Sequence, residues 1–393
     1  MRIPCGKCGR MEPKTCAKQD CPYFTRTKRT LKKDFSGQTP NLFVGRYGYP
    51  NIRVGMLATE EYADNDDPKK WSSQNTSIPD IVDKRASLVN STFTTSIKSF
   101  KDRLLEQAQL VAQSKKPTEM EVSLDKVPSF GVNYSTGAVP HGASVKLLKS
   151  AITENVRIPR AIDKAVSDTD LKATEALRTL YGKTDEYALT KLMTAGLLGQ
   201  GSSRKLVPTR WGITAVDDSL GKQALEDVRQ LSVLSEPTAY FGGHYGNYYL
   251  ILCFPRHWQF ELFELYTGSA KADGTWTDYE GHSGRKDYAD DTAGGYYASR
   301  LPVAEHLKQL KRQASVLVIR FITDEYTNPL GVWVCREATR KALLERPVTF
   351  ATEELMLQYA SARAKRFGVD FEQAIKAQSK LIASFAQRTL GDF

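Results

Sequence analysis

The sequence predicts an α+β fold, with a helical first half, a sheet-rich second half, a small N-terminal zinc module and a short C-terminal peptide. Three observations lead to this prediction. Four of the six cysteines fall within the first 21 residues. Apolar residues recur at helical spacing between residues 97 and 198, and aromatic and branched residues form runs of strand length after Thr238. With 393 residues, 41% of them hydrophobic, the chain is long enough to bury a sizeable core.

The N-terminal module, residues 1–37, contains the pattern Cys5-x2-Cys8-x7-Cys16-x4-Cys21. Four thiolates complete the shell of a tetrahedral zinc ion and leave no open position for a substrate. The spacing therefore predicts a structural Zn²⁺ site. An iron–sulfur cluster and a chance grouping of cysteines are the alternatives. Zinc would replace the core that so short a module cannot supply, since metal binding and folding are then one equilibrium.

Positive charge is concentrated in the same module. Residues 1–33 hold ten Lys and Arg against two acidic residues, a net charge of +8 in a chain whose total is +10. Residues 355–393 carry +3, and residues 34–354 carry −1. A basic module joined to a nearly neutral body indicates a polyanionic partner, and its charge would suit a nucleic acid. The alternative is a zinc-stabilised lid that docks on the protein's own body.

The α+β body is expected to span residues 41–386, with a sub-boundary near residue 235. Its first segment, residues 41–57, has short apolar pieces broken by glycines, which predicts strands with turns or bulges. Residues 267–300 are rich in Gly, Asp and Tyr and are expected to form a long insertion without periodicity. Later strands are expected at Thr238–Tyr245, Tyr248–Phe254, Trp258–Tyr266 and Ala314–Thr323.

Several cations and aromatic residues of the body could bind a nucleic acid or a nucleotide. Arginines can grip phosphates, and aromatic rings can stack on bases. A bulged strand pair with half-buried tyrosines is the alternative for the first four candidates, and packing is the alternative for the last two. The candidates are Arg46, Tyr47, Tyr49, Arg53, Arg210 and Trp211.

Four stretches resemble the archaeal Nre family of DNA repair proteins. They are Asn41-Leu-Phe-Val-Gly-Arg-Tyr-Gly-Tyr-Pro-Asn-Ile-Arg-Val-Gly55, Leu206-Val-Pro-Thr-Arg-Trp-Gly-Ile-Thr-Ala-Val-Asp217, Gly294-Gly-Tyr-Tyr-Ala-Ser-Arg-Leu-Pro302 and Asn328-Pro-Leu-Gly-Val-Trp-Val. The resemblance extends over residues 1–393. It implies a cytoplasmic archaeal protein of the DNA-damage response that binds the sliding clamp PCNA through a C-terminal peptide. It assigns no catalytic activity to particular residues.

The last seven residues fit a clamp-binding pattern when they are considered alone. Gln387, Leu390 and Phe393 match Q-x-x-h-x-x-a, in which one 3₁₀ turn places the two apolar side chains on one side. The single terminal aromatic departs from the usual form and suggests a lower affinity. An ordinary frayed C-terminus is the alternative.

The sequence gives weaker indications of catalysis. No GxxxxGK[ST] or GxSxG motif occurs, which excludes P-loop motors and ordinary serine hydrolases. His257, Gln259 and Glu261 alternate along one strand, and Asp324 and Glu325 follow another strand. We take His257, Glu261, Asp324 and Glu325 as catalytic candidates; a solvated sheet surface is the alternative. A nuclease-like or other hydrolase acting on nucleic acids or nucleotides is therefore the second functional hypothesis.

Membrane association is not expected. The longest apolar runs, such as Tyr248–Phe254, are far shorter than the roughly 18–20 residues of a membrane span. The first residues, Met-Arg-Ile-Pro-Cys, lack the apolar stretch of a secretory signal. These features predict a cytoplasmic protein without disulfides.

Overall fold

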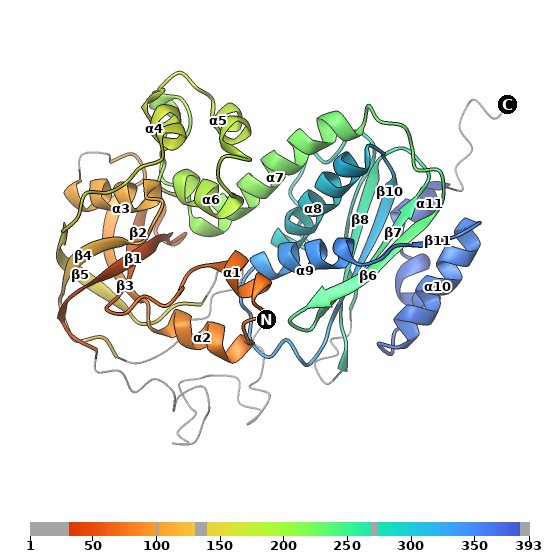
Figure 1. The fold of residues 1–393 in the computed structure, drawn as a ribbon, viewed down its shortest axis with the longest axis horizontal. Coiled ribbons are helices and arrows are strands. Elements are labelled where there is room, and N and C mark those ends of the chain that lie inside the picture. Colours follow the sequence, from red (N-terminus) through yellow and green to blue (C-terminus); the bar gives the residue numbers. More distant parts are fainter. Residues whose placement is uncertain (1–30, 100–101, 130–139, 269–273, 386–393) are drawn as a thin grey trace. The chain divides into compact units, whose positions relative to one another are not determined.

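The computed structural model describes residues 31–99, 102–129, 140–268 and 274–385 (Figure 1). The chain divides into two compact units. Unit 1 comprises residues 1–220 and 328–331, and unit 2 comprises residues 221–327 and 332–393. The division falls within helix α7 (Thr209–Val228), upstream of the sub-boundary expected near residue 235. The four cysteines of the predicted zinc site and residues 387–393 lie outside the described residues.

Unit 1 contains a closed five-stranded barrel with the strand order β1-β2-β3-β5-β4 (Figure 1). Neighbouring strands are antiparallel, except that β3 and β5 are parallel. The first part of β1 pairs with β4 and its last part pairs with β2, with a register shift between Gln38 and Asn41. This shared strand lets the sheet close on itself. The strands are β1 (Asp34–Val44), β2 (Asn51–Thr59), β3 (Val89–Ser96), β4 (Thr118–Leu124) and β5 (Ser144–Ile152).

Alternation of apolar side chains fills the barrel interior. Along β2, Ile52, Val54 and Met56 are fully buried, while Asn51 and Arg53 are exposed. Because side chains of a strand alternate between faces, the apolar set faces inward and Arg53 points outward. The same alternation buries Met120, Val122 and Leu124 of β4.

Helices complete unit 1. Helices α1 and α2 separate β2 from β3, helix α3 separates β3 from β4, and α4, α5, α6 and the 3₁₀ turn η2 follow β5. Asp67, Ser77, Asp102 and Asp185 cap α1, α2, α3 and α6 by accepting backbone N–H bonds. The helices are α1 (Pro68–Ser73), α2 (Ile78–Ala86), α3 (Arg103–Gln113), α4 (Arg160–Ser167), α5 (Ala173–Leu180), α6 (Glu186–Thr194) and η2 (Gly201–Ser203).

The mixed α+β class is confirmed, but the prediction of a helical region after the opening strands is wrong for part of unit 1. Strands β3, β4 and β5 lie between residues 89 and 152. Strand β3 reads Val-Asn-Ser-Thr-Phe-Thr-Thr-Ser, so it has few apolar residues to mark a strand period. The helix expected from Ile97 begins only at Arg103, after the capping residue Asp102.

Unit 2 is built on a six-stranded sheet in the order β11-β6-β7-β10-β8-β9. The sheet is antiparallel except for the parallel pair β8 and β10. Its strands include the four expected after Thr238. They are β6 (Thr238–His244), β7 (Asn247–Phe254), β8 (Gln259–Tyr266), β9 (Trp276–Glu280), β10 (Ser315–Ile322) and β11 (Val348–Thr349).

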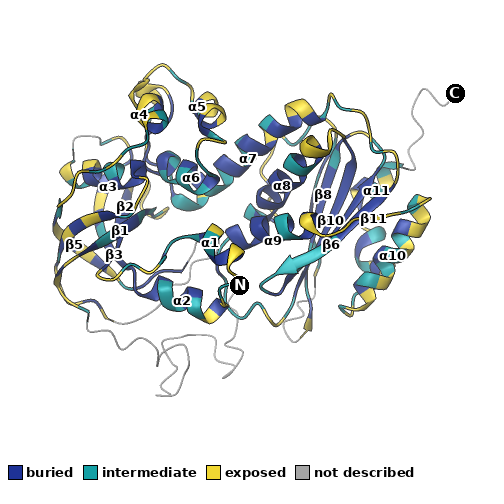
Figure 2. Cartoon of the chain, in the orientation of Figure 1, coloured by how far each residue is buried: buried dark blue, intermediate teal, exposed yellow. Residues whose placement is uncertain are grey.

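Both faces of this sheet are covered. Strand β10 lies in the middle of the sheet between β7 and β8, and every one of its residues is buried (Figure 2). One face packs on α8 and α9, and the other on α10, η4 and α11. The expected insertion at residues 267–300 instead contains β9 and the start of α8. The helices are α8 (Gly294–Leu310), α9 (Trp333–Leu344), α10 (Glu353–Lys365), η4 (Glu372–Lys376) and α11 (Lys380–Phe385).

Within the described part of the chain, no helix combines the length and apolar composition that crossing a membrane requires.

Candidate nucleic-acid interface

The turn joining β1 to β2 presents two tyrosines to solvent. The N–H of Gly45 donates to the carbonyl of Arg53 at 2.8 Å and closes the hairpin. Gly48 has φ +83°, and a Cβ there would lie 2.6 Å from the carbonyl oxygen of Asn51, so the turn requires glycine. Tyr47 is 79% exposed and Tyr49 is 46% exposed. The expectation of half-buried tyrosines therefore does not hold for Tyr47.

Arg46 is held against Tyr47. Its Nη2 donates to the Tyr47 hydroxyl at 3.1 Å, and its guanidinium carbon lies 5.0 Å from the ring centroid. Both residues are exposed. The pair presents a cation and a ring together, which is the combination that binds a phosphate and an adjacent base.

A second segment lies beside this turn. The Ile97 N–H donates to the Pro50 carbonyl at 3.0 Å, and the Leu206 N–H donates to the Ile97 carbonyl at 2.9 Å. The Val44 N–H donates to the Thr209 hydroxyl at 2.9 Å. These bonds fix residues 203–211 against the turn.

These hydrogen bonds place the Trp211 ring beside the Tyr49 ring. Their ring centroids are 6.1 Å apart and their planes are inclined by 50°. Tyr49 and Trp211 are 46% and 48% exposed, so both side chains remain accessible to a ligand. The structure thus brings together candidates that the sequence places in two distant segments.

We call residues 45–53, 97–99 and 203–211 the basic–aromatic rim. These segments contain six Lys and Arg and no Asp or Glu. The Arg204 guanidinium donates to the carbonyls of Gly199 and Asp168, and burial lowers its pKa. The other five cations are exposed or half-buried: Arg46, Arg53, Lys98, Lys205 and Arg210. Sequence reasoning missed Lys98 and Lys205, because only the barrel places them beside the tyrosines.

Glu261 in β8 has a different environment from the one expected. It is fully buried, and its carboxylate accepts bonds from the Ser379 hydroxyl at 2.5 Å and from the N–H groups of Lys380 and Leu381 at 3.0 and 3.1 Å. Burial raises the pKa of Glu261, and these hydrogen bonds oppose that rise. Glu261 therefore anchors the start of α11, and the interpretation of a solvated surface is wrong at this position.

The remaining catalytic candidates do not join Glu261. His257 is exposed, with its ring 5.9 Å from that of His282. In the register of β8 and β10, Glu261 lies beside Leu317, whereas Asp324 follows the far end of β10. At about 3.3 Å per residue, the separation of seven positions from Leu317 to Asp324 spans roughly 23 Å.

Glu325 accepts a hydrogen bond from the Tyr248 hydroxyl at 3.0 Å at that far end. Among the residues that the structure describes, no three His, Cys, Asp or Glu side chains are grouped as metal ligands. The catalytic candidates are thus separated: Glu261 lies in β8, His257 lies in the bend before β8 and not on the strand as expected, and Asp324 and Glu325 lie in the turn after β10.

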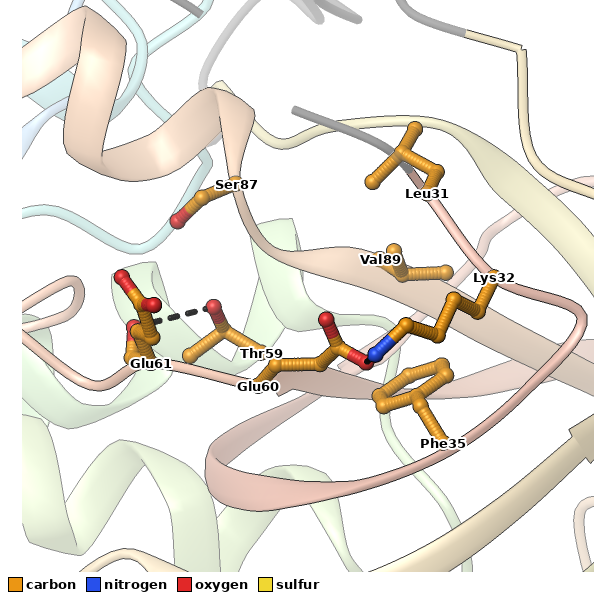
Figure 3. Close-up of a pocket in the computed structure, with 8 residues that line it drawn as sticks. All are labelled: Leu31, Lys32, Phe35, Thr59, Glu60, Glu61, Ser87 and Val89. Atoms are coloured by element: carbon orange, nitrogen blue, oxygen red, sulfur yellow. Dashed lines mark hydrogen bonds and ion pairs between the residues drawn. The ribbon is translucent and has the colours of Figure 1, made fainter. Parts of the chain in front are cut away.

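A pocket of about 200 Å³ lies at the opposite end of the β1–β2 hairpin from the turn (Figure 3). Lys32 pairs with Glu60 across it at 2.8 Å, and the Thr59 hydroxyl donates to the Glu61 carbonyl at 3.1 Å. None of the predicted site residues that the structure describes lines this pocket. Its lining residues are Leu31, Lys32, Phe35, Thr59, Glu60, Glu61, Ser87 and Val89.

Comparison with known proteins covers nearly the whole chain. Residues 15–272 match the family described as Archaeal Nre, N-terminal, and residues 280–393 match Archaeal Nre, C-terminal. The chain belongs to the archaeal Nre family. Among the Nre relatives, DNA repair protein NreA of Haloferax volcanii is 36% identical over 344 residues, covering 81% of each chain.

Two further Nre relatives come from Archaeoglobus fulgidus. DNA repair protein NreB is 33% identical over 404 residues and covers 100% of both chains. DNA repair protein NreA is 33% identical over 401 residues and covers 98% of this chain and 99% of its own. No solved structure matches the chain.

Proposed function

We propose that this Nre protein acts in DNA repair, binds DNA directly and is brought to it by the sliding clamp PCNA. The observation that carries the repair role is the match along the chain to three relatives named as DNA repair proteins. Direct DNA binding and clamp recruitment are argued from the chain's own residues.

DNA contact is assigned to two basic regions. The basic–aromatic rim supplies five available cations and three exposed rings, and residues 1–33 supply a net charge of +8. Both would neutralise phosphates, so DNA affinity should fall steeply with salt. The rim adds rings that can contact bases.

The N-terminal module is assigned a structural zinc ion. Cys5, Cys8, Cys16 and Cys21 supply the four-thiolate donor set that zinc prefers. The ion would order the module and would take no part in a reaction, because four protein ligands leave no open position.

Clamp recruitment is assigned to Gln387, Leu390 and Phe393. The described fold ends at Phe385, whose ring packs 4.9 Å from that of Phe254 and under the Arg256 guanidinium at 4.2 Å. The motif begins two residues later, after the last residue of α11. We expect this short peptide with its single aromatic anchor to bind with an affinity on the order of 1 μM, about −8 kcal/mol.

Survival after DNA damage tests this proposal. An archaeal strain lacking the gene should be sensitive to DNA-damaging agents, and the wild-type chain should restore survival. The variant with Leu390→Ala and Phe393→Ala should restore it poorly at equal protein level, because it is not delivered to DNA. Full rescue by that variant would contradict clamp recruitment, and normal survival of the deletion strain would contradict the repair role.

A further inference from the structure

We propose that the barrel of unit 1 is a binding platform for single-stranded DNA. The bound strand lies across the β1–β2 turn and the outer faces of β2 and β3. The proposal rests on the proposed function, since it names the form of DNA that the basic–aromatic rim takes. It also extends the site from the rim onto the barrel wall.

The barrel's topology is the first argument. Its order β1-β2-β3-β5-β4, the parallel pairing of β3 with β5, the helix α3 between β3 and β4, and the sharing of β1 by two partners are together the features of an OB-fold. OB-folds bind oligonucleotides on the face of strands 2 and 3 and on the loop between strands 1 and 2. This is an analogy between folds, so the function must be argued from side chains.

The second argument is that the side chains stand where this topology would need them. Arg46, Tyr47 and Tyr49 occupy the β1–β2 turn. Their residue types alone predict contacts with phosphates and bases. Arg210 and Trp211 are fixed beside the same turn by the bonds through Ile97 and Thr209.

The third argument is a polar track on the outer wall. Arg53 of β2 lies opposite Thr94 of β3, and both are exposed. Thr92, two residues earlier on the same face, lies beside exposed Lys146 of β5. The track therefore continues from the turn across three strands with cations and hydroxyls, which are groups that hold a phosphodiester backbone.

The exposed aromatic rings favour single-stranded over double-stranded DNA. Tyr47, Tyr49 and Trp211 expose from 46 to 79% of their surface. Rings of this kind stack on unpaired bases, whose faces a duplex keeps covered by neighbouring base pairs. Phosphate contacts alone would accept both forms, so the three exposed rings favour the single strand.

Tryptophan fluorescence of the full chain gives a direct test. Of the five tryptophans, Trp211 is exposed, Trp71, Trp258 and Trp333 are buried, and Trp276 is partly buried. A thymidine oligonucleotide of about 15 nucleotides, within the site size of an OB-fold, is titrated against a hairpin duplex of equal phosphate count. We expect the single strand to quench the emission and to bind at least about tenfold more tightly than the duplex.

Variants test whether the fluorescence quench arises from binding at the basic–aromatic rim. Trp211→Phe should abolish the quench, because it removes the exposed indole that reports binding. The variant with Tyr47→Ala and Tyr49→Ala should lose at least about tenfold in affinity for the single strand and at most about twofold for the duplex. Tyr288→Ala in unit 2 is the matched control, since Tyr288 is 44% exposed, and it should change neither affinity.

The outcomes separate this inference from the proposed function. Equal affinity for the two DNA forms, or unchanged single-strand affinity in the double tyrosine variant, would overturn the platform while DNA repair and clamp recruitment stand. Binding of a protein to the rim in competition with the oligonucleotide, with no quench by DNA, would also overturn it. If the full chain bound neither form, direct DNA binding itself would fail.

Discussion

Tyr49 in the β1–β2 turn and Trp211 in the first turn of α7 place their ring centroids 6.1 Å apart. Backbone hydrogen bonds through Pro50, Ile97 and Leu206 hold the two segments together, so the contact does not depend on the rings alone. The contact joins the β1–β2 turn and the start of α7 into one surface, and both segments contribute cations to that surface.

The turn should depend on Gly48. With φ +83° and the Asn51 carbonyl oxygen 2.6 Å from the position of a Cβ, Gly48→Ala should destabilise unit 1 by about 1–2 kcal/mol. It should also weaken DNA binding, because Tyr47 and Tyr49 move. Chemical denaturation and oligonucleotide binding measure the two effects. Gly281→Ala, where the nearest contact is an ordinary 3.5 Å, is the control and should change the stability little. Wild-type stability in Gly48→Ala would show that the turn has another conformation.

Unit 2 should depend strongly on one buried ion pair. Arg300 and Glu280 lie 2.8 Å apart with almost no solvent exposure, and Glu280 also accepts a bond from the Trp258 indole at 3.1 Å. Glu280→Ala would remove the buried carboxylate that pairs with the guanidinium, at a cost of about 3–5 kcal/mol in unfolding free energy. Urea denaturation measures it.

The exposed pair Lys308 and Asp227, 2.5 Å apart, supplies the control. Asp227→Ala should cost no more than about 1 kcal/mol, because water and salt screen the pair. Equal effects of Glu280→Ala and Asp227→Ala would contradict the assigned burial.

Glu261 should make stability depend on pH. Burial raises its pKa in the folded state, so the folded protein holds this proton more tightly than the unfolded chain. Protonated Glu261 makes its full contribution to the unfolding free energy below the ordinary carboxyl pKa. That contribution is lost as the pH rises through the raised pKa of the folded state. Relative to Glu261→Gln, the wild type should therefore lose unfolding free energy as the pH rises above the ordinary carboxyl pKa of about 4.3. Exposed Glu345→Gln serves as the control, and a wild-type gain over that range would show that the hydrogen bonds outweigh burial.

The sequence predicted much of unit 2 and less of unit 1. Strands such as β7 and β10 are continuous apolar runs, and these mark a buried sheet without further information. The polar strand β3 gives no such signal, because its pairing with β2 and β5 comes from barrel closure. Arg46 and Trp211 could be singled out by residue type, but their proximity depends on long-range hydrogen bonds. The interpretation of a solvated face failed at Glu261, because strand alternation predicts which side chains share a face but does not reveal that α11 covers that face.

The N-terminal module should carry about one zinc ion per chain. Elemental analysis of the purified protein should find it, and replacing Cys5 and Cys8 with serine should remove it, because a four-thiolate site needs all its ligands. The barrel should keep its unfolding transition in that variant. Replacing Cys253 and Cys335, both buried in unit 2, should leave the zinc content unchanged. Zinc-free wild-type protein would exclude the site.

Calorimetric titration of the full chain into the archaeal PCNA clamp tests recruitment most directly. The account predicts binding on the order of 1 μM for the wild type. It predicts no detectable binding for Leu390→Ala with Phe393→Ala, because a few buried anchors carry most of such an interface. Thermal stability and oligonucleotide affinity should be unchanged in that variant. Undiminished clamp affinity in the double variant would contradict the assignment of the clamp contact to residues 387–393.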